Sequence, residues 1–253
     1  KLNPAKAWTS LAMSAGLSIL AVGVGTQIPL SAAASPLWLL YCVITGTIAM
    51  GCWVIAHECG HHAFHPNRCI EGVVGFVLHS ILLVPYYSWG HSHAVHHAHC
   101  NHLEKGQTHV PSRATSPIGK ITEQLKQNLN PVIFGIISLF NHLVIGWQLY
   151  LFFGVTGGEE YESPTSHFWN RKRNSIRKKR LFHKSFQKWM TRSNIGLLSM
   201  VSLLIAASIQ YSLLRVVCLY GLPYMVINMW LTTYTWLQHT NQDIPHFSNE
   251  TWS

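Results

Sequence analysis

Four long apolar segments constrain the fold of this chain more than any other feature of its sequence. They cover residues 7–26, 37–56, 195–212 and 216–237, and each approaches the length of about 20 apolar residues that a helix needs to cross a bilayer. Only 11% of the 253 residues are charged, which is less than half of the share that is usual in soluble domains. The sequence therefore predicts an all-α integral membrane protein.

The connections between these segments predict how they pair. Pro29 and Pro36 separate the first two segments, and a very short connection around Arg215 separates the last two. Short connections make neighbouring helices antiparallel. We therefore expect two transmembrane hairpins, which together give four spans.

Two further apolar stretches, at 73–89 and 132–153, are ambiguous. If 73–89 crossed the membrane, the histidines on its two sides would lie on opposite faces. If 132–153 crossed, the basic residues of 171–192 would leave the face that carries the histidines. We therefore expect both stretches to be interfacial or re-entrant helices, in a single domain over residues 1–253 with a histidine-rich cap and a basic connector at 159–192.

The basic residues are concentrated rather than spread along the chain. Lys and Arg outnumber Asp and Glu by 18 to 9, and ten of the eighteen lie between Arg171 and Arg192. A local excess of this kind favours anionic lipid headgroups over nucleic acid as a partner. With four spans, every basic residue except Arg215 falls on one face, so we expect the histidines on the cytoplasmic face, or on the stromal face of a plastid membrane.

Two histidine clusters directly adjoin apolar segments. The first is His57-Glu-Cys-Gly-His61-His62, and the second contains His93-Ala-Val-His96-His97. Offsets of three and four residues place side chains on one face of a helix, and imidazole is the commonest protein ligand of transition metals. Five such imidazoles exceed what a four-coordinate zinc site uses, which favours two metal ions.

Three other functions account for only part of this pattern. His57-Glu58-Cys-Gly-His61 satisfies the H-E-x-x-H signature of zinc metalloproteases, in which Glu58 would activate water, although a protease leaves the second cluster without a role. A metal carrier is expected to place its ligands within the spans, and a b-type cytochrome needs only one or two axial histidines. The protease is the competing hypothesis from another functional class.

These clusters and several further stretches resemble the membrane fatty acid desaturase family, and specifically its omega-6, Delta-12-type acyl-lipid branch. Besides the two clusters, the matching stretches are Asn101-His-Leu-Glu104, Val110-Pro111, Phe153-Gly-Val-Thr-Gly157, Tyr234-Thr-Trp-Leu-Gln-His239 and Pro245-His246-Phe247. The resemblance implies a non-haem di-iron centre held by His57, His61, His93, His96, His97 and His239. His62, Glu58 and Glu104 are further candidates, either as ligands or as residues that orient ligands.

The resemblance also implies a reaction and its partners. It implies that two iron ions and dioxygen introduce a double bond into a fatty acyl chain of a membrane lipid. This bond would be the second double bond of the chain, of Delta-12 or omega-6 type. Electrons would come from ferredoxin or cytochrome b5. Acyl hydroxylases and epoxygenases of the same di-iron family stay open as alternatives. The family carries a third histidine cluster after the segment that matches Gln238-His239-Thr240, and we expect that this sequence lacks that C-terminal portion.

Overall fold

The chain is helical throughout its regular structure. The computed structural model describes residues 2–170, 177–239 and 243–252, and within these ranges it contains helices and two isolated β-bridges but no β-strand. This confirms the predicted all-α class. The chain divides into two compact units, residues 1–90 with 188–231 and residues 91–187 with 232–253. Residues 171–176 of the predicted basic block lie outside the described ranges.

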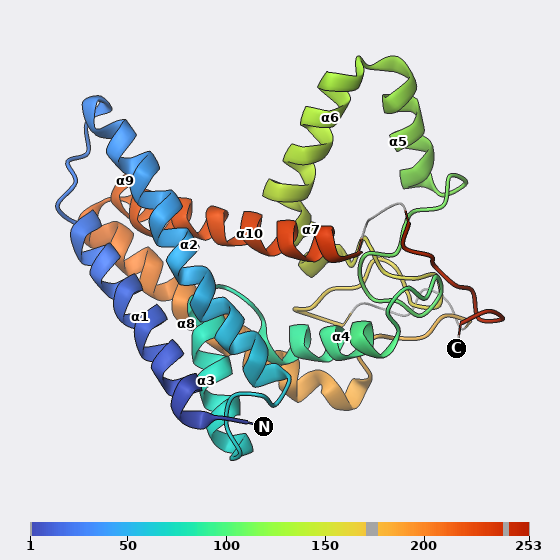
Figure 1. Ribbon diagram of the computed structural model, residues 1–253, viewed down its shortest axis with the longest axis horizontal. Coiled ribbons are helices and arrows are strands. Elements are labelled where there is room, and N and C mark those ends of the chain that lie inside the picture. Colours follow the sequence, from blue (N-terminus) through green and yellow to red (C-terminus); the bar gives the residue numbers. More distant parts are fainter. Residues whose placement is uncertain (1, 171–176, 240–242, 253) are drawn as a thin grey trace. The chain divides into compact units, whose positions relative to one another are not determined.

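The first unit is a bundle of long apolar helices (Figure 1). Helix α2 packs along α1 and also against α3. Its elements are α1 (Pro4–Gly25), η1 (Ala32–Ala34), α2 (Ser35–Gly60), α3 (Arg68–Ile81), α8 (Gln187–Tyr211), α9 (Leu213–Val216), η4 (Val217–Gly221) and the first part of α10 (Leu222–His239). The four predicted spans thus correspond to α1, α2, α8 and the continuous stretch from α9 to α10.

Small residues let the helices of this unit approach closely. A Cβ added to Gly46 of α2 would lie 2.6 Å from Val226 of α10, and one added to Gly51 would lie 2.5 Å from the Ser14 hydroxyl of α1. A hydrogen bond also joins two of these helices, since the Trp230 indole of α10 donates to the Thr47 hydroxyl of α2 at 2.9 Å. Close backbone approach with internal hydrogen bonds is the usual way in which membrane helices associate.

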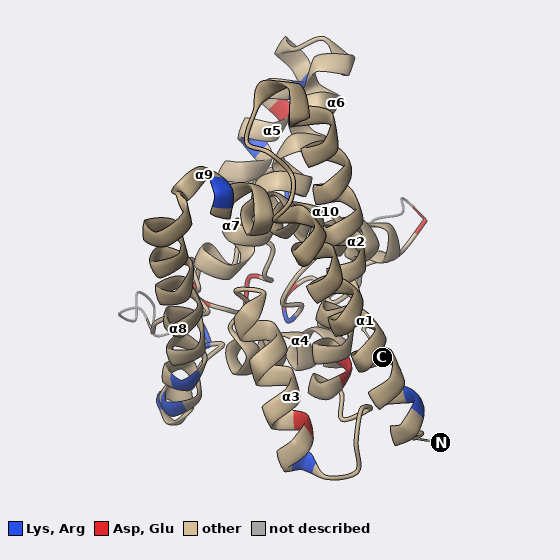
Figure 2. Cartoon of the chain, turned by 90° about the vertical axis from the view of Figure 1, so that its left-hand side faces the viewer, with Lys and Arg blue, Asp and Glu red and all other residues tan. Residues whose placement is uncertain are grey.

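Charged residues in the first unit lie near the ends of its helices. Figure 2 shows blue and red residues at these ends, whereas the lengths between them are tan. Lys6, Arg68 and Lys188 lie in the first turns of α1, α3 and α8, and Arg192 lies in the second turn of α8. Arg215 lies at the other end, where its guanidinium donates to the Ile28 carbonyl at 2.7 Å, in the connection that follows α1. Helices with uncharged middle sections suit a membrane environment.

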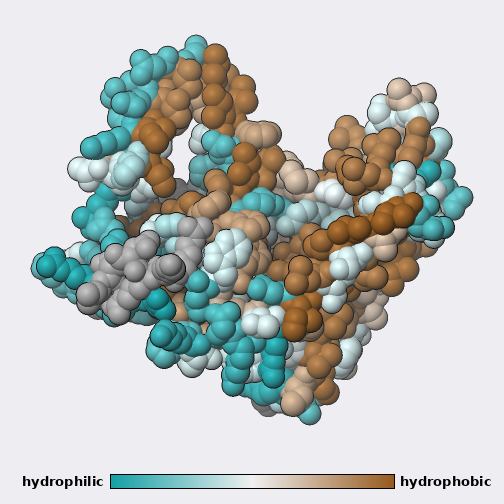
Figure 3. Space-filling view, turned by 180° about the vertical axis from the view of Figure 1, so that it is seen from behind, coloured by the Kyte–Doolittle hydropathy of each residue, from teal (hydrophilic) through white to brown (hydrophobic). Residues whose placement is uncertain are grey.

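The second unit combines an apolar hairpin with long irregular segments. Its elements are the end of α4 (Tyr86–Ala98), α5 (Pro117–Asn128), α6 (Pro131–Phe140), the π-helical turn η2 (Asn141–Ile145), α7 (Gly146–Phe153), η3 (Lys184–Phe186) and the last turns of α10. The side chains of Ser116 and Asn130 cap the first turns of α5 and α6. In Figure 3, α6 is brown and its neighbour α5 is largely teal, so only one arm of this hairpin suits lipid.

Within the described residues, five helical stretches are long and apolar enough to cross a membrane, one more than the four spans expected. The additional stretch, Pro131–Phe153, is the one that we expected to be interfacial. Length and composition do not distinguish a span from an apolar helix that lies at the interface, so the interfacial placement stays a prediction. The five stretches support a multi-pass membrane protein.

The other ambiguous stretch, 73–89, contains a sharp break. Helices α3 and α4 meet at an angle of 105°, and Leu83 between them has a φ of 53°, in the left-handed region. Pro85 comes two residues later, directly before α4, and proline disfavours helical conformation in the residue before it, which is Val84. A helix pair that bends this strongly has the form of a broken span or a re-entrant segment. The interfacial or re-entrant placement of 73–89 stays a prediction.

Candidate metal centre

The first histidine cluster lies where α2 ends. The Ala63 N–H donates to the Glu58 carbonyl and the His62 N–H donates to the Cys59 carbonyl, which is the pattern of a Schellman motif. His62 occupies the left-handed position of this motif with a φ of 61°, a position that usually favours glycine. The helix therefore stops within one turn of His57 and leaves His61 at its C-cap.

His57 and His61 form a pair of imidazoles, as their spacing predicts. Their Nε2 atoms lie 3.2 Å apart. The Glu58 carboxylate lies 2.9 Å from Nδ1 of His57, which directs Nε2 of that ring toward His61. The ring of His57 also stacks on Trp53 and contacts Trp89, with centroid separations of 5.7 Å for both pairs. His57 is thus held on several sides.

A buried carboxylate fixes the turn that follows. Glu71 lies in the first turn of α3 and is 1% exposed. It accepts hydrogen bonds from the Phe64 and His65 N–H groups, both at 3.0 Å, and contacts Nδ1 of His62 at 3.1 Å and the Arg68 guanidinium at 3.0 Å. Burial alone raises the pKa of this carboxyl, but these hydrogen bonds outweigh it and hold the pKa below its usual value. Glu71 therefore ties the residues after the first cluster to α3.

The second cluster lies on α4, again with the predicted spacing. Nε2 of His93 and Nε2 of His97 are 3.0 Å apart. The preceding residues hold the helix in place. His91 contacts the Leu181 carbonyl at 3.0 Å, and the Ser92 hydroxyl lies 2.8 Å from Nε2 of His167.

His96 pairs with a histidine that is distant in the sequence. Its Nε2 lies 3.3 Å from Nε2 of His239, the last residue of α10. Burial, with the neighbouring His239 and His97, lowers the pKa of His96 to about 4, and burial also lowers the pKa of His109 beside this pair to about 3. The fold thus keeps both rings neutral at physiological pH, which is the form that binds metals.

The three imidazole pairs fit a metal. Two nitrogens bound to one ion at about 2.1 Å are separated by about 3.0–3.4 Å when the angle between them is 90–110°. The observed separations of 3.0, 3.2 and 3.3 Å lie in or next to this range. In addition, Nδ1 of His96 is buried without a hydrogen-bond partner among the described residues. The donor set is entirely imidazole, which suits transition metals rather than magnesium or calcium.

Comparison with known proteins identifies the family. The sequence profile of the fatty acid desaturase family matches residues 34–252, which is most of the chain. The chain belongs to the fatty acid desaturase family. This confirms the resemblance noted from the histidine clusters, and family and clusters together suggest a metal centre.

Named relatives come from the acyl-lipid branch of the family. The chain is 38% identical over 222 residues to an acyl-lipid (9+3)-(E)-desaturase of Dimorphotheca sinuata, 35% identical over 215 residues to a Delta(12)-fatty-acid desaturase of Arabidopsis thaliana, and 32% identical over 229 residues to an oleate hydroxylase of Claviceps purpurea. These matches cover 85% or 86% of this chain and 53%, 53% and 48% of the relatives. The chain therefore spans about half the length of the curated relatives it matches.

Among the sequence-predicted site residues, Glu104 has different neighbours from the others. Its carboxylate lies 3.4 Å from Nδ1 of His102 and 3.6 Å from Arg113, and it accepts from the Asn249 N–H at 3.2 Å. The segment around it pairs through His102 with Phe247 in a parallel β-bridge. Two of the stretches that resemble desaturases are thus adjacent in the second unit, and Glu104 holds them together.

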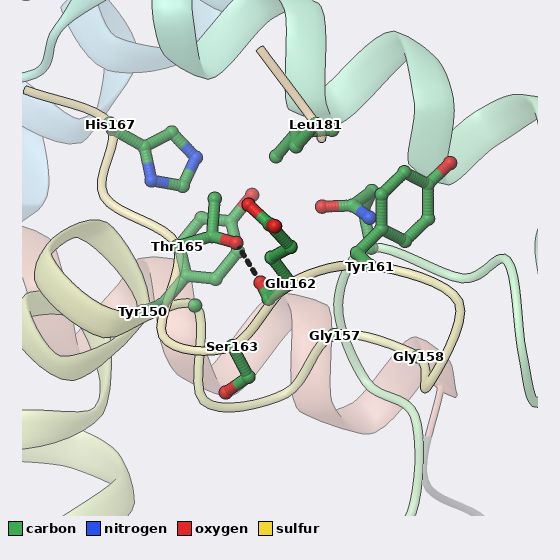
Figure 4. A pocket seen from close by; sticks show the side chains of 11 residues that line it. Tyr150, Gly157, Gly158, Tyr161, Glu162, Ser163, Thr165, His167 and Leu181 are labelled. Carbon is green, nitrogen blue, oxygen red and sulfur yellow. Dashed lines mark hydrogen bonds between the residues drawn. The ribbon is translucent and has the colours of Figure 1, made fainter. Parts of the chain in front are cut away.

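A small pocket in the second unit contains none of the predicted metal ligands (Figure 4). His167 and Tyr150 line it, together with Glu162 and the glycines of the loop after α7. The Tyr150 hydroxyl lies 2.9 Å from Ser92, which also contacts His167. Tyr150 and His167, which line the pocket, therefore also hold α4 in place through their contacts with Ser92.

Sequence reasoning missed several residues that shape this site. Glu71 contacts His62 of the first cluster, and His167 contacts Ser92, the residue directly before His93. Only Glu71 carried a signal, because an acidic residue after the Asn67 cap is typical of a helix start. Single histidines such as His167 are usually hydrogen-bonded structural residues, and His167 is one, since its Nδ1 contacts the Leu151 carbonyl at 3.1 Å.

Proposed function

We propose that this chain forms part of a membrane enzyme that desaturates a fatty acyl chain of a membrane lipid at a histidine-ligated di-iron centre. One observation carries the proposal. Imidazole pairs with nitrogen separations of 3.0–3.3 Å lie at or near the ends of helices α2, α4 and α10 in a member of the fatty acid desaturase family. The proposed ligands are His57, His61, His93, His96, His97 and His239.

Helix continuity supports a centre that both clusters share. Trp89 contacts His57 within the first unit and belongs to α4, the helix that carries the second cluster. His93 comes four residues after Trp89 and His97 four residues later, so both extend the same face of the helix.

The metal supplies the oxidising chemistry, because no side chain can remove hydrogen from an unactivated methylene group. The residues of this chain hold and orient the centre. Glu58 faces Nδ1 of His57 and Glu71 faces Nδ1 of His62, and such carboxylate–imidazole contacts fix the ring orientation and raise the basicity of the other nitrogen. In this interpretation Glu58 orients a ligand and is not the water-activating base of a protease.

The charges of the first unit support an orientation in the membrane. Four basic residues lie within the first two turns of α1, α3 and α8, namely Lys6, Arg68, Lys188 and Arg192. They lie at the end of the unit where Trp8 of α1 packs on Phe64, just after the first histidine cluster. Basic residues favour the cytoplasmic side. We therefore place the centre at the cytoplasmic or stromal face, where an acyl chain can reach it from the bilayer and ferredoxin or cytochrome b5 can deliver electrons.

Hydroxylation is the second candidate, because one of the relatives is named an oleate hydroxylase. The test is to express the complete gene product in a host whose membranes contain only monounsaturated acyl chains and to profile the fatty acids. New dienes support the proposal. Hydroxylated chains would instead support the second candidate.

A matched pair of variants separates the metal centre from general folding. His93→Ala removes one nitrogen of a ligand pair, and His183→Ala removes an exposed histidine of the second unit outside the clusters. We expect His93→Ala to abolish both activity and bound iron, whereas His183→Ala should retain both. A purified, active protein with one zinc and no iron would contradict the di-iron proposal.

A further inference from the structure

Two histidines outside the predicted ligand set stack on the last turn of α10. The ring of His109 lies parallel to that of His239, with an interplanar angle of 14° and centroids 4.8 Å apart. The ring of His142 stacks on Trp236 at 17° and 5.0 Å. Trp236 and His239 are three residues apart, so they share one face of the helix. The helix end that presents His239 is therefore covered by two imidazole rings.

The backbone around His109 is fixed in an uncommon conformation. His109 has a φ of 58°, in the left-handed region that residues other than glycine rarely adopt. Both of its neighbours are tied to Thr156. The Thr108 hydroxyl lies 3.2 Å from the Thr156 hydroxyl, and the Val110 N–H donates to the Thr156 carbonyl at 3.2 Å. These two contacts hold the loop so that the His109 ring faces His239.

His142 is fixed in a comparable way. It lies in the π-helical turn η2, which interrupts the apolar helix between α6 and α7. Its Nδ1 contacts the Ser138 carbonyl at 2.7 Å, which orients the ring. Single π-helical turns inside α-helices are frequent at functional sites. Two independently anchored rings thus meet neighbouring turns of α10.

We propose that His109 is a positioning residue. His109 stacks on His239 while His142 stacks on Trp236, and together the two rings hold the end of α10 so that Nε2 of His239 faces His96. The proposal deepens the proposed function and rests on it, because His239 is a proposed metal ligand. The parallel rings indicate that His109 acts through its aromatic face and not as a metal-binding nitrogen. The Nε2 atoms of His96 and His239 are already 3.3 Å apart, the separation that a shared ion requires.

The test compares variants that keep or remove the ring. The complete gene product is purified, stripped of metal and titrated with Co²⁺, whose visible spectrum reports the number and geometry of its ligands. His109→Ala removes the stacked ring and should weaken the affinity for Co²⁺ by about three- to tenfold, with a changed spectrum. His109→Phe retains the stack and should restore both affinity and spectrum. His183→Ala serves as the control.

Each outcome has a distinct meaning. If His109→Phe binds Co²⁺ as weakly as His109→Ala, the nitrogen of His109 is required and the stacking role is refuted. If His109→Ala binds Co²⁺ as tightly as the unaltered protein, the stacking role is also refuted. If His109→Ala does not fold, His142→Ala on the exposed turn provides the test, with a weaker affinity that His142→Phe restores. An unaltered protein that binds neither Co²⁺ nor iron refutes the proposed metal centre itself.

Discussion

Removal of the Glu71 carboxylate should destabilise the protein more than the loss of any exposed acidic residue. Four groups contact this carboxylate, but they contribute unequally. Arg68 and His62 have side chains that are 63% and 59% exposed, so water replaces their contacts at a cost of about 0–1 kcal/mol each. The N–H groups of buried Phe64 and half-buried His65 lose their ionised acceptor when the carboxylate is removed, and each loss costs about 1.5–3 kcal/mol of unfolding free energy.

The sum of the two backbone terms predicts a loss of about 3–6 kcal/mol in the free energy of unfolding for Glu71→Ala. Glu71→Gln retains an oxygen that can accept from both N–H groups and loses only the charge, so we expect a loss of about 1–2 kcal/mol. The control is Glu123→Gln on the exposed surface of α5, which should change stability by less than about 0.5 kcal/mol.

The assay is equilibrium unfolding of the detergent-solubilised protein, with bound iron measured on the same samples. Because Glu71 ties the first histidine cluster to α3, Glu71→Ala should also lower the iron content, whereas Glu71→Gln should retain most of it. Equal destabilisation by Ala and Gln would show that the backbone hydrogen bonds are not the source of the effect. A loss for Glu71→Ala no larger than that for Glu123→Gln would refute the reasoning entirely.

Three further predictions concern the support of α4 and the metal. Ser92→Ala removes the hydroxyl that contacts both Tyr150 and His167, and should cost about 1–3 kcal/mol in unfolding free energy, measured in the same assay, with Ser185→Ala as an exposed control. Burial lowers the pKa of His167 from 6.5 to about 4, so the contribution of neutral His167 to stability is full above pH 6.5 and is lost as the pH falls toward 4. His167→Gln should therefore flatten the dependence of melting temperature on pH between 7 and 5. An unchanged slope would contradict this expectation. Chelation of the metal should lower the melting temperature and added Fe²⁺ should restore it, because an ion that binds only the folded protein stabilises that state. Equal melting temperatures with and without metal would show that no metal stabilises the fold.

The sequence predicted those parts of the site that depend on helix periodicity. His57 with His61 and His93 with His97 pair across one helical turn, and their separations follow once the helices are recognised. The apolar lengths of the predicted spans likewise follow from a single physical requirement, that backbone polar groups be paired inside lipid.

The remaining features depend on contacts that periodicity does not encode. The turn that brings His62 to Glu71 requires a left-handed histidine where glycine is usual, and nothing in the local sequence indicates that conformation. The stack of His109 on His239 joins a loop and a helix end that are far apart in the chain. The stretch 131–153 is ambiguous for another reason, because its composition suits a span and an interfacial helix equally.

The length of α2 sets the depth at which the first two imidazoles lie. Its 26 residues extend about 39 Å at about 1.5 Å per residue, beyond the hydrocarbon thickness of about 30 Å. One residue inserted into the apolar part of α2 would rotate His57 and His61 together by about 100° about the helix axis. Seven inserted residues would nearly restore their direction but displace both side chains by about 10 Å along that axis. If the proposed centre is correct, the length of this helix would set the distance between the hydrocarbon core and the metal, and its register would limit which carbon of an acyl chain reaches that metal.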